Sequence, residues 1–343
     1  MKKEETMNIV CSTDDNYVPL CGIMLTSLFE NNKGHYISVY ILTEGISSQH
    51  RSLLKNITQR RDYNGEIHLC VVKDNRFNYC PIRSGDHVSV AAYYRFLIPE
   101  LLPQNIDKAL YLDCDIIVNG SLSDLYGTDM SNVCIAACAE HTGDSYTLRV
   151  SEENINRLGY PKEWGYFNSG VMLLNLTYWR QKKVTDDLFA YVMRNHDKCL
   201  FHDQDTLNAV LGNKKKFIPY KYNFMTVLFT DGNEKRINPV ILQERPIIIH
   251  YCTAVKPWEW YLVDYPFKKQ WEHYRKMSLW KKWRGNKPWS ERLKRVLIAL
   301  LYKMKGNIKK PFPLFFFFLL AMLVKSNCMI SRAGCFNVGR LNV

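Results

Sequence analysis

The chain has 343 residues, of which 47% are hydrophobic and 23% charged, an ordinary balance for a globular protein that buries a sizeable core. Its net charge of +13 arises at the C-terminal end, because residues 265–343 carry 18 Lys and Arg against 2 Asp and Glu, whereas residues 1–264 carry 28 against 31. The N-terminal part therefore has no excess of basic residues that would indicate nucleic-acid binding.

Eleven cysteines lie in apolar runs, and none forms a Cys-x-x-Cys pair. An odd number without framework spacing predicts reduced thiols in a cytosolic chain and excludes a zinc ribbon or a secreted disulfide scaffold. The N-terminal residues 1–6 have no apolar segment of signal-peptide length behind them, which also favours a cytoplasmic chain.

Apolar strands alternate with helical patterns along the first part of the chain. Strands are predicted at 7–13, 38–43 and 66–72, and helices at 20–28 and 47–57. This alternation predicts parallel βαβ units and a doubly wound α/β sheet. Ligands bind such sheets beyond the carboxyl ends of the strands.

The turn after the first strand lacks the Gly-x-Gly-x-x-Gly fingerprint of dinucleotide binding. It carries Asp14, Asn16 and Tyr17, which are suited to hydrogen-bonding the edge of a base and stacking on its face. The alternative interpretation is a helix N-cap formed by Asp or Asn.

Two carboxylates, Asp113 and Asp115, interrupt the apolar run 109–118 at positions i and i+2. In a strand such residues point to the same side, and two adjacent carboxylates repel each other unless a proton or a cation lies between them. Oxygen ligands suit Mg²⁺ or Mn²⁺. An isolated Asp-x-Asp is also common in loops without a metal.

A second apolar strand, 245–252, contains His250 near its end, and Lys256 follows a few residues later. An imidazole beside the two carboxylates would favour Mn²⁺ over Mg²⁺. A metal with a lysine, and no nucleophilic Ser or Cys nearby, indicates a diphosphate ligand. A histidine that only supports the strand end is the alternative.

The basic segment 265–343 predicts membrane contact. Within 290–305 apolar side chains recur at helical spacing among Lys and Arg, namely Leu293, Val296, Leu297, Leu300, Leu301 and Met304. This pattern is typical of a basic amphipathic helix on an anionic membrane surface. The apolar face disfavours nucleic acid as the partner. Packing on the N-terminal domain or pairing of two subunits is the alternative.

Aromatic residues flank this helix. Upstream, five of them alternate with Lys and Arg in a mixture that suits lipid headgroups: Trp271, Tyr274, Trp280, Trp283 and Trp289. Downstream, the apolar run within 311–324 is too short to span a bilayer, which takes about 20 residues. We therefore expect residues 265–324 to contact an anionic membrane surface.

Several motifs together resemble the family 8 glycosyltransferases, and within them the bacterial galactosyl- and glucosyltransferases of lipopolysaccharide synthesis. The motifs follow one another in the family's order over about residues 7–260. They are Ile9-Val-Cys-Ser-Thr-Asp-Asp-Asn-Tyr, Tyr111-Leu-Asp-Cys-Asp, Tyr166-Phe-Asn-Ser-Gly-Val-Met-Leu-Leu-Asn-Leu, Asp203-Gln-Asp-Thr-Leu-Asn, Tyr222-Asn-Phe-Met and His250-Tyr-Cys-Thr-Ala-Val-Lys-Pro-Trp.

The resemblance implies a GT-A fold, a doubly wound mixed sheet, in a nucleotide-sugar transferase domain at 7–264. The pattern of charged, aromatic and apolar residues described above predicts that a helical, membrane-associating tail follows at 265–343. It implies retaining transfer of galactose or glucose from a UDP-hexose to a lipopolysaccharide or other cell-surface glycan or glycolipid acceptor, with Mn²⁺ or possible Mg²⁺ as cofactor. A cytoplasmic enzyme held peripherally on the inner face of the cytoplasmic membrane would meet such an acceptor.

The resemblance also assigns residues. Asp14, Asn16 and Tyr17 would hold the uridine, Asp113, Asp115 and His250 would ligate the metal, and Lys256 would neutralise the leaving phosphate. Arg95, Asn168, Asp203 and Gln204 would contact the donor sugar, and His87 would line the acceptor side. Two departures bear on donor choice, Glu140 where relatives have an aspartate and Thr253 where they have a glycine.

Retention of configuration ordinarily needs a carboxylate nucleophile on the opposite face of the sugar. The matching residue here is the amide Gln204, a poor nucleophile, with Asp203 beside it. Our hypothesis is same-face attack through a short-lived ion pair, with the departing phosphate as base.

Other functions compete with this interpretation. A phosphatase or phosphotransferase places Asp-x-Asp near the start of its domain, whereas over a hundred residues precede it here. A sugar-nucleotide pyrophosphorylase needs a Gly-rich basic N-terminal loop that this chain lacks. A non-catalytic UDP-sugar-binding relative stays as an alternative.

Overall fold

The computed structural model describes most of the first 285 residues. The described residues are 6–60, 63–82, 89–140, 151–229, 241, 243–252, 256–259 and 265–285. The chain divides into two compact units, residues 1–286 and 287–343, and all of the described residues belong to the first. This division comes later in the chain than the domain boundary that we predicted after residue 264.

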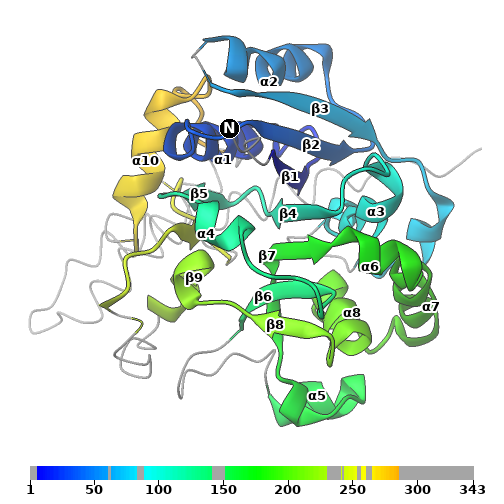
Figure 1. Ribbon diagram of the computed structural model, residues 1–343. Helices are drawn as coiled ribbons and strands as arrows, with labels where there is room; N and C mark the ends of the chain where they lie inside the picture. The colour runs from blue at the N-terminus through cyan, green and yellow to red at the C-terminus, as the bar shows by residue number, and fades with distance from the viewer. Residues whose placement is uncertain are drawn as a thin grey trace, which may run out of the picture. The chain divides into compact units, whose positions relative to one another are not determined.

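Seven strands form a central sheet in the order β3-β2-β1-β4-β7-β6-β8 (Figure 1). Neighbours from β3 to β4 are parallel, β7 runs antiparallel to β4 and β6, and β8 is parallel to β6. The predicted mixed α/β sheet is therefore confirmed. The strands are β1 Met7–Ser12, β2 Ile37–Thr43, β3 Gly65–Val71, β4 Lys108–Leu112, β6 Ile135–Ala139, β7 Phe167–Asn175 and β8 Lys215–Phe217.

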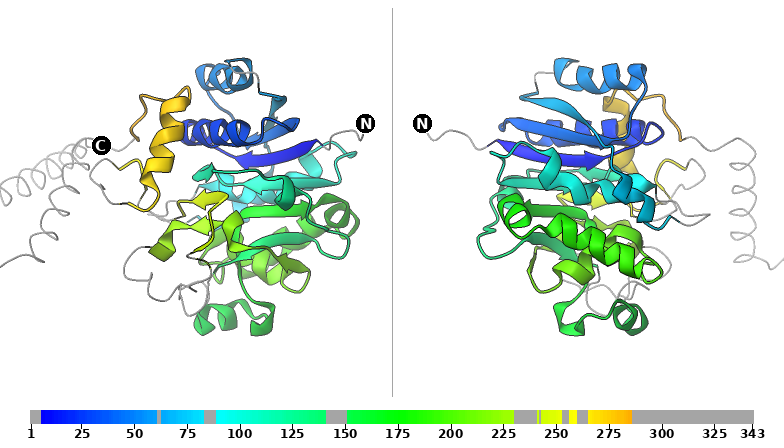
Figure 2. Two further views of the ribbon diagram at one scale, coloured as in Figure 1. Left: turned by 60° about the vertical axis from the view of Figure 1, so that its left-hand side comes forward. Right: turned by 90° about the vertical axis from the view of Figure 1, so that its right-hand side faces the viewer.

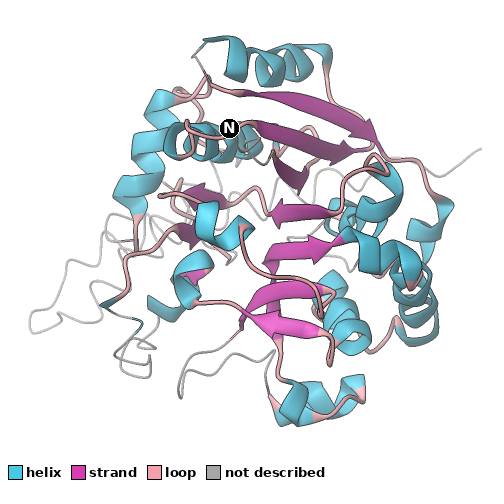
Figure 3. Ribbon diagram, viewed as in Figure 1, coloured by secondary structure: helices cyan, strands magenta, loops and turns pink. Residues whose placement is uncertain are grey.

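The helices are distributed along the chain between these strands (Figure 3). The α-helices are α1 Val18–Asn31, α2 Ser48–Arg60, α3 Ile98–Leu101, α4 Ser123–Tyr126, α5 Glu152–Leu158, α6 Leu176–Gln181, α7 Val184–Asn195, α8 His202–Leu211 and α10 Lys268–Met277. The 3-10 helices are η1 Asn75–Tyr79, η2 Val90–Leu97, η4 Lys162–Trp164, η5 Tyr220–Tyr222 and η6 Thr226–Phe229.

Both faces of the sheet are buried, because successive strand residues point to opposite sides. In β1, Ile9 and Cys11 pack in one apolar cluster with residues of α1 and α2, whereas Val10 packs in a second cluster with residues of η2 and α7. The near-continuous burial of β2 follows from these two cores. Because helices cover both faces of the sheet, the site lies at the ends of the strands.

The apolar run 109–118 does not form one strand. It divides into β4 in the central sheet and β5 Ile116–Val118 in a second, three-stranded sheet with the order β5-β10-β9. β9 is Phe224–Met225 and β10 is Ile248–His250, and β10 pairs antiparallel with β5. Asp113 and Asp115 therefore lie in the connection between two sheets rather than along a strand.

The start of the predicted tail belongs to the folded unit, which corrects one expectation. Helix α10 lies beside α1 (Figure 2), and Asn31 Nδ2 donates to Tyr274 Oη at 2.8 Å. Trp271, Tyr274 and Trp280 are only 2%, 7% and 7% exposed and join the apolar core of this unit. These aromatic side chains pack inside the protein, where they cannot reach lipid headgroups.

The rest of the predicted membrane segment, including Trp289, the helix at 290–305 and the apolar run at 311–324, lies outside the described residues. Within the described ranges, no helix is both long and apolar enough to cross a bilayer.

Gly22 of helix α1 faces Trp280, which lies in the loop after α10. A Cβ at Gly22 would lie 1.8 Å from Cζ3 of Trp280, far inside van der Waals contact. We expect Gly22→Ala to lower the free energy of unfolding in urea by about 1–3 kcal/mol through overpacking. That cost exceeds the benefit of about 1 kcal/mol that alanine brings to a helix interior.

Gly34→Ala is the matched control, since nothing lies within 4 Å of the position that a Cβ would take there. In a double-mutant cycle, Trp280→Ala should remove most of the destabilisation that Gly22→Ala causes. An unchanged urea midpoint for Gly22→Ala alone would contradict the packing of α1 against Trp280.

Candidate active site

The three predicted metal ligands converge beyond the end of β4. Oxygens of Asp113 and Asp115 and a ring nitrogen of His250 all lie within 4.8 Å of one another. Asp113 is held by its backbone, whose N–H donates to Gly170 O at 2.9 Å, and by Tyr111 Oη, which donates to Asp113 Oδ1 at 2.9 Å. The two sheets thus bring ligands from distant parts of the sequence together.

A neighbouring amide fixes the orientation of the imidazole. Nδ1 of His250 lies 2.9 Å from Asn223 Oδ1, and Asn223 Nδ2 donates to Asn168 Oδ1 at 2.9 Å. Because the oxygen of Asn223 can only accept, Nδ1 is the donor in this contact, and Nε2 is the ring nitrogen that faces the carboxylates. Nε2 lies 3.3 Å from Asp115 Oδ1 and 3.8 Å from Asp113 Oδ2. A carbonyl-type partner on the outer nitrogen is usual for a metal-binding histidine.

Gly170 leaves room beside these ligands. A Cβ at this position would lie 2.2 Å from His250 Cε1 and 2.8 Å from Asp113 Oδ2, so any larger residue would intrude on the donor atoms. Two carboxylates and one neutral imidazole form a donor set that suits a divalent cation such as Mn²⁺. The residues therefore fit a metal site.

Lys256 lies directly beside one of the carboxylates. Its Nζ donates to Asp115 Oδ2 at 2.5 Å and to Tyr251 O at 2.6 Å. Burial works against both charged groups, but their mutual attraction raises the pKa of Lys256 and lowers the pKa of Asp115, with His250 also lowering the latter. Both groups are therefore charged near neutral pH.

A second cation, Arg95, joins the metal-binding carboxylates to the residues predicted to contact the sugar. Its side chain is 4% exposed, Nη2 donates to Asp113 Oδ1 at 2.8 Å, and Nη1 lies 3.2 Å from Asp203 Oδ2. The guanidinium also stacks over the ring of Tyr111 at 4.2 Å. Arg95 thus acts as a buried bridge between two anions rather than as a surface ion-pair partner.

The predicted sugar-contacting residues form one buried hydrogen-bond network. Gln204 Oε1 accepts from Ser169 N at 3.0 Å and from Asn168 Nδ2 at 3.2 Å. Glu140 Oε2 accepts from Asn168 Nδ2 at 2.8 Å and from Gln204 Nε2 at 3.2 Å. Ser169 Oγ donates to Asp203 Oδ2 at 3.1 Å. The network connects β7, α8 and Glu140, the residue that follows β6, and it orients all five polar side chains.

The residues predicted to hold the base lie in the loop between β1 and α1. Tyr17 N donates to Asp14 Oδ1 at 2.9 Å within the turn before α1, but the N-cap of the helix is Tyr17 and no side chain caps it, so the alternative interpretation of an Asp or Asn N-cap is wrong. Asn16 and Tyr17 are exposed at the surface of this loop. Desolvation raises the pKa of the Tyr17 hydroxyl, Lys256 opposes this effect, and Asp115 adds to it, so Tyr17 lies near both of these charged residues. The loop therefore borders the same site.

Three residues of the site were not assigned from the sequence, although they lie in motifs that the sequence displayed. Asn223 orients His250, Gly170 makes room for the ligands, and Ser169 links Asp203 to Gln204. The sequence signal that could have identified Asn223 and Ser169 was their polar side chains within the motifs Tyr222-Asn-Phe-Met and Tyr166-Phe-Asn-Ser-Gly. His87 and Thr253 lie outside the described residues.

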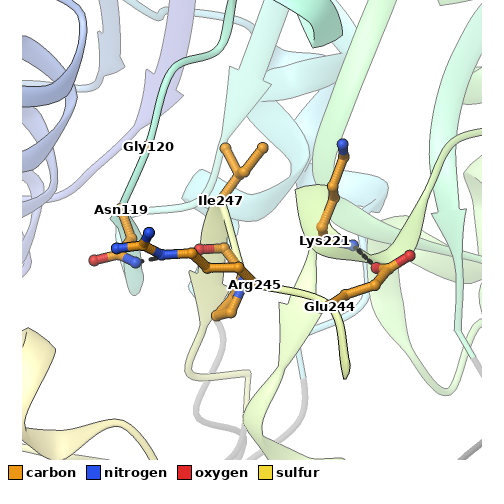
Figure 4. A pocket seen from close by; sticks show the side chains of 7 residues that line it. Asn119, Gly120, Lys221, Glu244, Arg245 and Ile247 are labelled. Carbon is orange, nitrogen blue, oxygen red and sulfur yellow. Dashed lines mark hydrogen bonds between the residues drawn. The ribbon is translucent and has the colours of Figure 1, made fainter. Parts of the chain in front are cut away.

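A surface groove of about 580 Å³ lies elsewhere, at the end of β10 opposite His250 (Figure 4). It is lined by Asn119, Gly120, Lys221, Glu244, Arg245, Pro246 and Ile247. Glu244 Oε2 accepts from the backbone N–H of Lys221 at 2.9 Å. None of the predicted site residues lines this groove.

Known proteins are similar to this chain in sequence. The chain is 29% identical to General stress protein A of Bacillus subtilis, over 82% of this chain and 96% of that protein. It is also 29% identical to the lipopolysaccharide glucosyltransferase WaaO of Escherichia coli, over 80% of this chain and 79% of WaaO. Both similarities therefore extend over most of the two chains compared.

A crystal structure of the galactosyltransferase LgtC, in complex with donor and acceptor sugar analogs, has a TM-score of 0.68 to this chain at 25% identity, covering 84% of this chain and 100% of LgtC. The central sheet thus resembles the GT-A type sheet of LgtC. The sequence profile of glycosyl transferase family 8 matches residues 8–260, which include every predicted metal ligand. The chain is therefore a glycosyltransferase and belongs to glycosyl transferase family 8.

Proposed function

We propose that this enzyme transfers a hexose, galactose or glucose, from a UDP-sugar to a hydroxyl group of a lipopolysaccharide or other cell-surface glycan acceptor, with retention of configuration. The observation that carries the proposal is the convergence of Asp113, Asp115 and His250 within 4.8 Å, with the Lys256 ammonium 2.5 Å from Asp115. Such a cluster of hard donors beside a fixed positive charge matches the needs of a departing diphosphate.

The three ligands would hold Mn²⁺, with Mg²⁺ as the second choice. When bound, the metal supplies Lewis-acid stabilisation of the charge that develops on the diphosphate. The imidazole contributes a nitrogen, which favours Mn²⁺. Tyr17, Asn16 and Asp14, which border this site, would hold the uridine.

Lys256 would stabilise the leaving phosphate directly. Its ammonium is anchored by Asp115 and by the carbonyl oxygen of Tyr251, so it is placed before the substrate arrives. A preorganised charge needs no reorganisation as the bond to the sugar breaks. Its side chain is 13% exposed, which limits competition by water.

The geometry around Gln204 and Asp203 supports attack on the same face of the sugar as UDP departure. Gln204 Oε1 already accepts two hydrogen bonds, and Asp203 is engaged by Arg95 and Ser169. Neither side chain is arranged as an unengaged nucleophile. We propose that both orient the sugar, and that the departing phosphate accepts the proton of the acceptor hydroxyl.

Glu140 would influence donor choice. It is fully buried and hydrogen-bonded to Asn168 and Gln204, both predicted sugar contacts. The longer side chain of glutamate moves its carboxylate one methylene further than an aspartate would reach. Thr253 and His87 keep their proposed roles at the phosphate and the acceptor.

The acceptor and the location follow from the relatives and from the tail sequence. WaaO is named as a lipopolysaccharide glucosyltransferase, and LgtC was crystallised with an acceptor sugar analog. We propose a cytoplasmic enzyme that binds peripherally to the inner face of the cytoplasmic membrane. We place the proposed membrane contact in the basic segment after residue 286, and the sequence of 290–324 supports this proposal.

The competing functions are less well supported. Membership of a glycosyltransferase family disfavours a phosphotransferase. It also disfavours a non-catalytic nucleotide binder, which the UDP-release measurement below distinguishes from a transferase.

Replacing both aspartates tests the metal site. We expect Asp113→Asn combined with Asp115→Asn, or removal of divalent metal by a chelator, to lower the rate of UDP release from UDP-galactose or UDP-glucose by at least about 10²–10³. The measurement is UDP release across a panel of UDP-sugars with added Mn²⁺. Asp124→Asn, an exposed carboxylate in α4, is the control and should leave the rate unchanged.

Equal UDP release by the double variant and the parent protein would contradict the metal site. Silence of the parent with every donor, while nucleotide binding is retained and lipid acceptors are present, would contradict the transferase.

Replacing Lys256 tests the leaving-group role. Lys256→Ala should lower kcat by about 10²–10³ with a smaller effect on the KM for the donor, because the charge acts mainly in the transition state. Steady-state kinetics with saturating Mn²⁺ provide the measurement. Lys55→Ala, an exposed lysine of α2, is the control. A change confined to KM would show that Lys256 only binds the ground state.

Replacing Gln204 distinguishes an orienting amide from a nucleophile. We expect Gln204→Ala to lower kcat by about 10–100-fold, the scale of a misplaced substrate. Gln49→Ala, exposed on α2, should be neutral. A loss of about 10⁴ or more would be typical of a missing nucleophile and would overturn same-face attack, as would a glycosylated enzyme detected by intact mass.

A further inference from the structure

A second cluster of metal-binding side chains lies beside the carboxylate site. Three cysteines form it, Cys11 of β1, Cys21 of α1 and Cys114, and we refer to them as the thiol cluster. Their sulfur atoms all lie within 4.8 Å of one another, and Cys11 Sγ is 3.6 Å from Cys21 Sγ. The three cysteines are free thiols, and they are 0%, 0% and 7% exposed.

This spacing matches trigonal coordination of one cation. Three sulfurs placed around a cation at the Zn–S distance of about 2.3 Å stand about 4.0 Å apart. The Cys11–Cys21 separation of 3.6 Å and the upper limit of 4.8 Å for all three pairs are compatible with that spacing, so small side-chain rotations would bring all three sulfurs to one ion. Cys114 Sγ donates to the carbonyl oxygen of Ser12 at 3.2 Å, a hydrogen bond that metal binding would replace.

Other buried cysteines of the described chain are arranged differently. Cys134 Sγ donates to Lys214 O at 2.9 Å, and Cys138 Sγ donates to Pro219 O at 3.3 Å. Each of these thiols is satisfied by a backbone carbonyl, which is the behaviour of a small core side chain. Cys114 Sγ also donates to a carbonyl, Ser12 O, but the three thiols of the cluster differ in that their sulfurs additionally lie within 4.8 Å of one another.

We propose that the thiol cluster is a binding site for one thiophilic divalent cation, Zn²⁺ or Cd²⁺, separate from the site of the catalytic metal. Binding replaces three S–H bonds by three metal–sulfur bonds and releases three protons to solvent, with no change of oxidation state. Soft thiolates select such cations, whereas the neighbouring carboxylates select Mn²⁺ or Mg²⁺.

The sequence Asp113-Cys114-Asp115 places the two sites back to back. Cys114 points its sulfur toward β1 and α1, while the flanking aspartates hold the harder donor set. A cation in the thiol cluster would therefore tie β1, α1 and the β4–β5 connection together without using a carboxylate. Because it binds only the folded chain, it raises the temperature of unfolding.

The test is a titration of the full-length protein with Cd²⁺ as the probe. Excess Mn²⁺ is present to occupy the carboxylate site, and a phosphine reductant keeps the thiols reduced. Four other cysteines are first replaced by serine, Cys70 and Cys252, which are partly exposed, and Cys328 and Cys335 of the C-terminal segment. The expected result is an ultraviolet thiolate-to-cadmium absorption band that saturates at one equivalent, with a higher unfolding temperature.

Cys21→Ala should abolish the band, and Cys138→Ala, an equally buried cysteine outside the cluster, should retain it. Alkylation followed by mass spectrometry of the parent gives an answer that does not depend on the variants, because Cd²⁺ should protect Cys11, Cys21 and Cys114 together. A band that persists in folded Cys21→Ala, or no band and no protection in the parent, would overturn the proposal. The proposal would also be overturned if, before the reductant is added, the only change detected in the cluster is a disulfide between Cys11 and Cys21.

Discussion

The repulsion between Asp113 and Asp115, and the way in which the chain compensates it, governs much of the structure around the site. Arg95 donates to Asp113, and Lys256 donates to Asp115, so each carboxylate has its own cation. The guanidinium of Arg95 also lies 3.2 Å from Asp203, so that its charge compensates a third carboxylate, which is buried. Isolated charges in such a site would be costly, and this pairing with two cations allows three carboxylates to lie close together.

The two sheets make this pairing possible. β4 ends at Leu112, and the chain then crosses to β5, so the two aspartates lie where the chain passes from one sheet to the other. Their backbone is held from both sides, because Asp113 N–H donates to Gly170 O and Asp115 O accepts from the N–H of Tyr251. β10 pairs with β5 in antiparallel register, which sets His250 opposite Ile116 and next to Asp115. Asn223, just before β9 in the same sheet, then fixes the imidazole. A small sheet of short strands thus positions the ligands as accurately as the large one.

The sequence was a good guide wherever a short-range pattern was enough. Apolar runs alternating with helical patterns predicted β1 to β3 and α1 closely, and the Asp-x-Asp spacing singled out two carboxylates that lie beside His250. Trp271 and Trp280 were misread, because an aromatic residue among lysines looks the same in sequence whether it enters a core or a membrane interface. Trp280 is buried since Gly22, far away in the sequence, leaves a place for its ring. Long-range partners such as Asn223 and Ser169 carry no periodic signal of their own.

The charges built into the site bear on how the protein acquires its metal. Arg95 and Lys256 already neutralise the ligand carboxylates through direct hydrogen bonds, and His250 is held by an amide rather than by the ion. Small metal-dependent domains of the zinc-finger type have no such internal counter-charges and unfold when the metal is removed. If the proposed metal is bound at this site, the chain would complete its folding first and load the cation afterwards, so that cellular metal supply would control its catalytic output rather than its abundance.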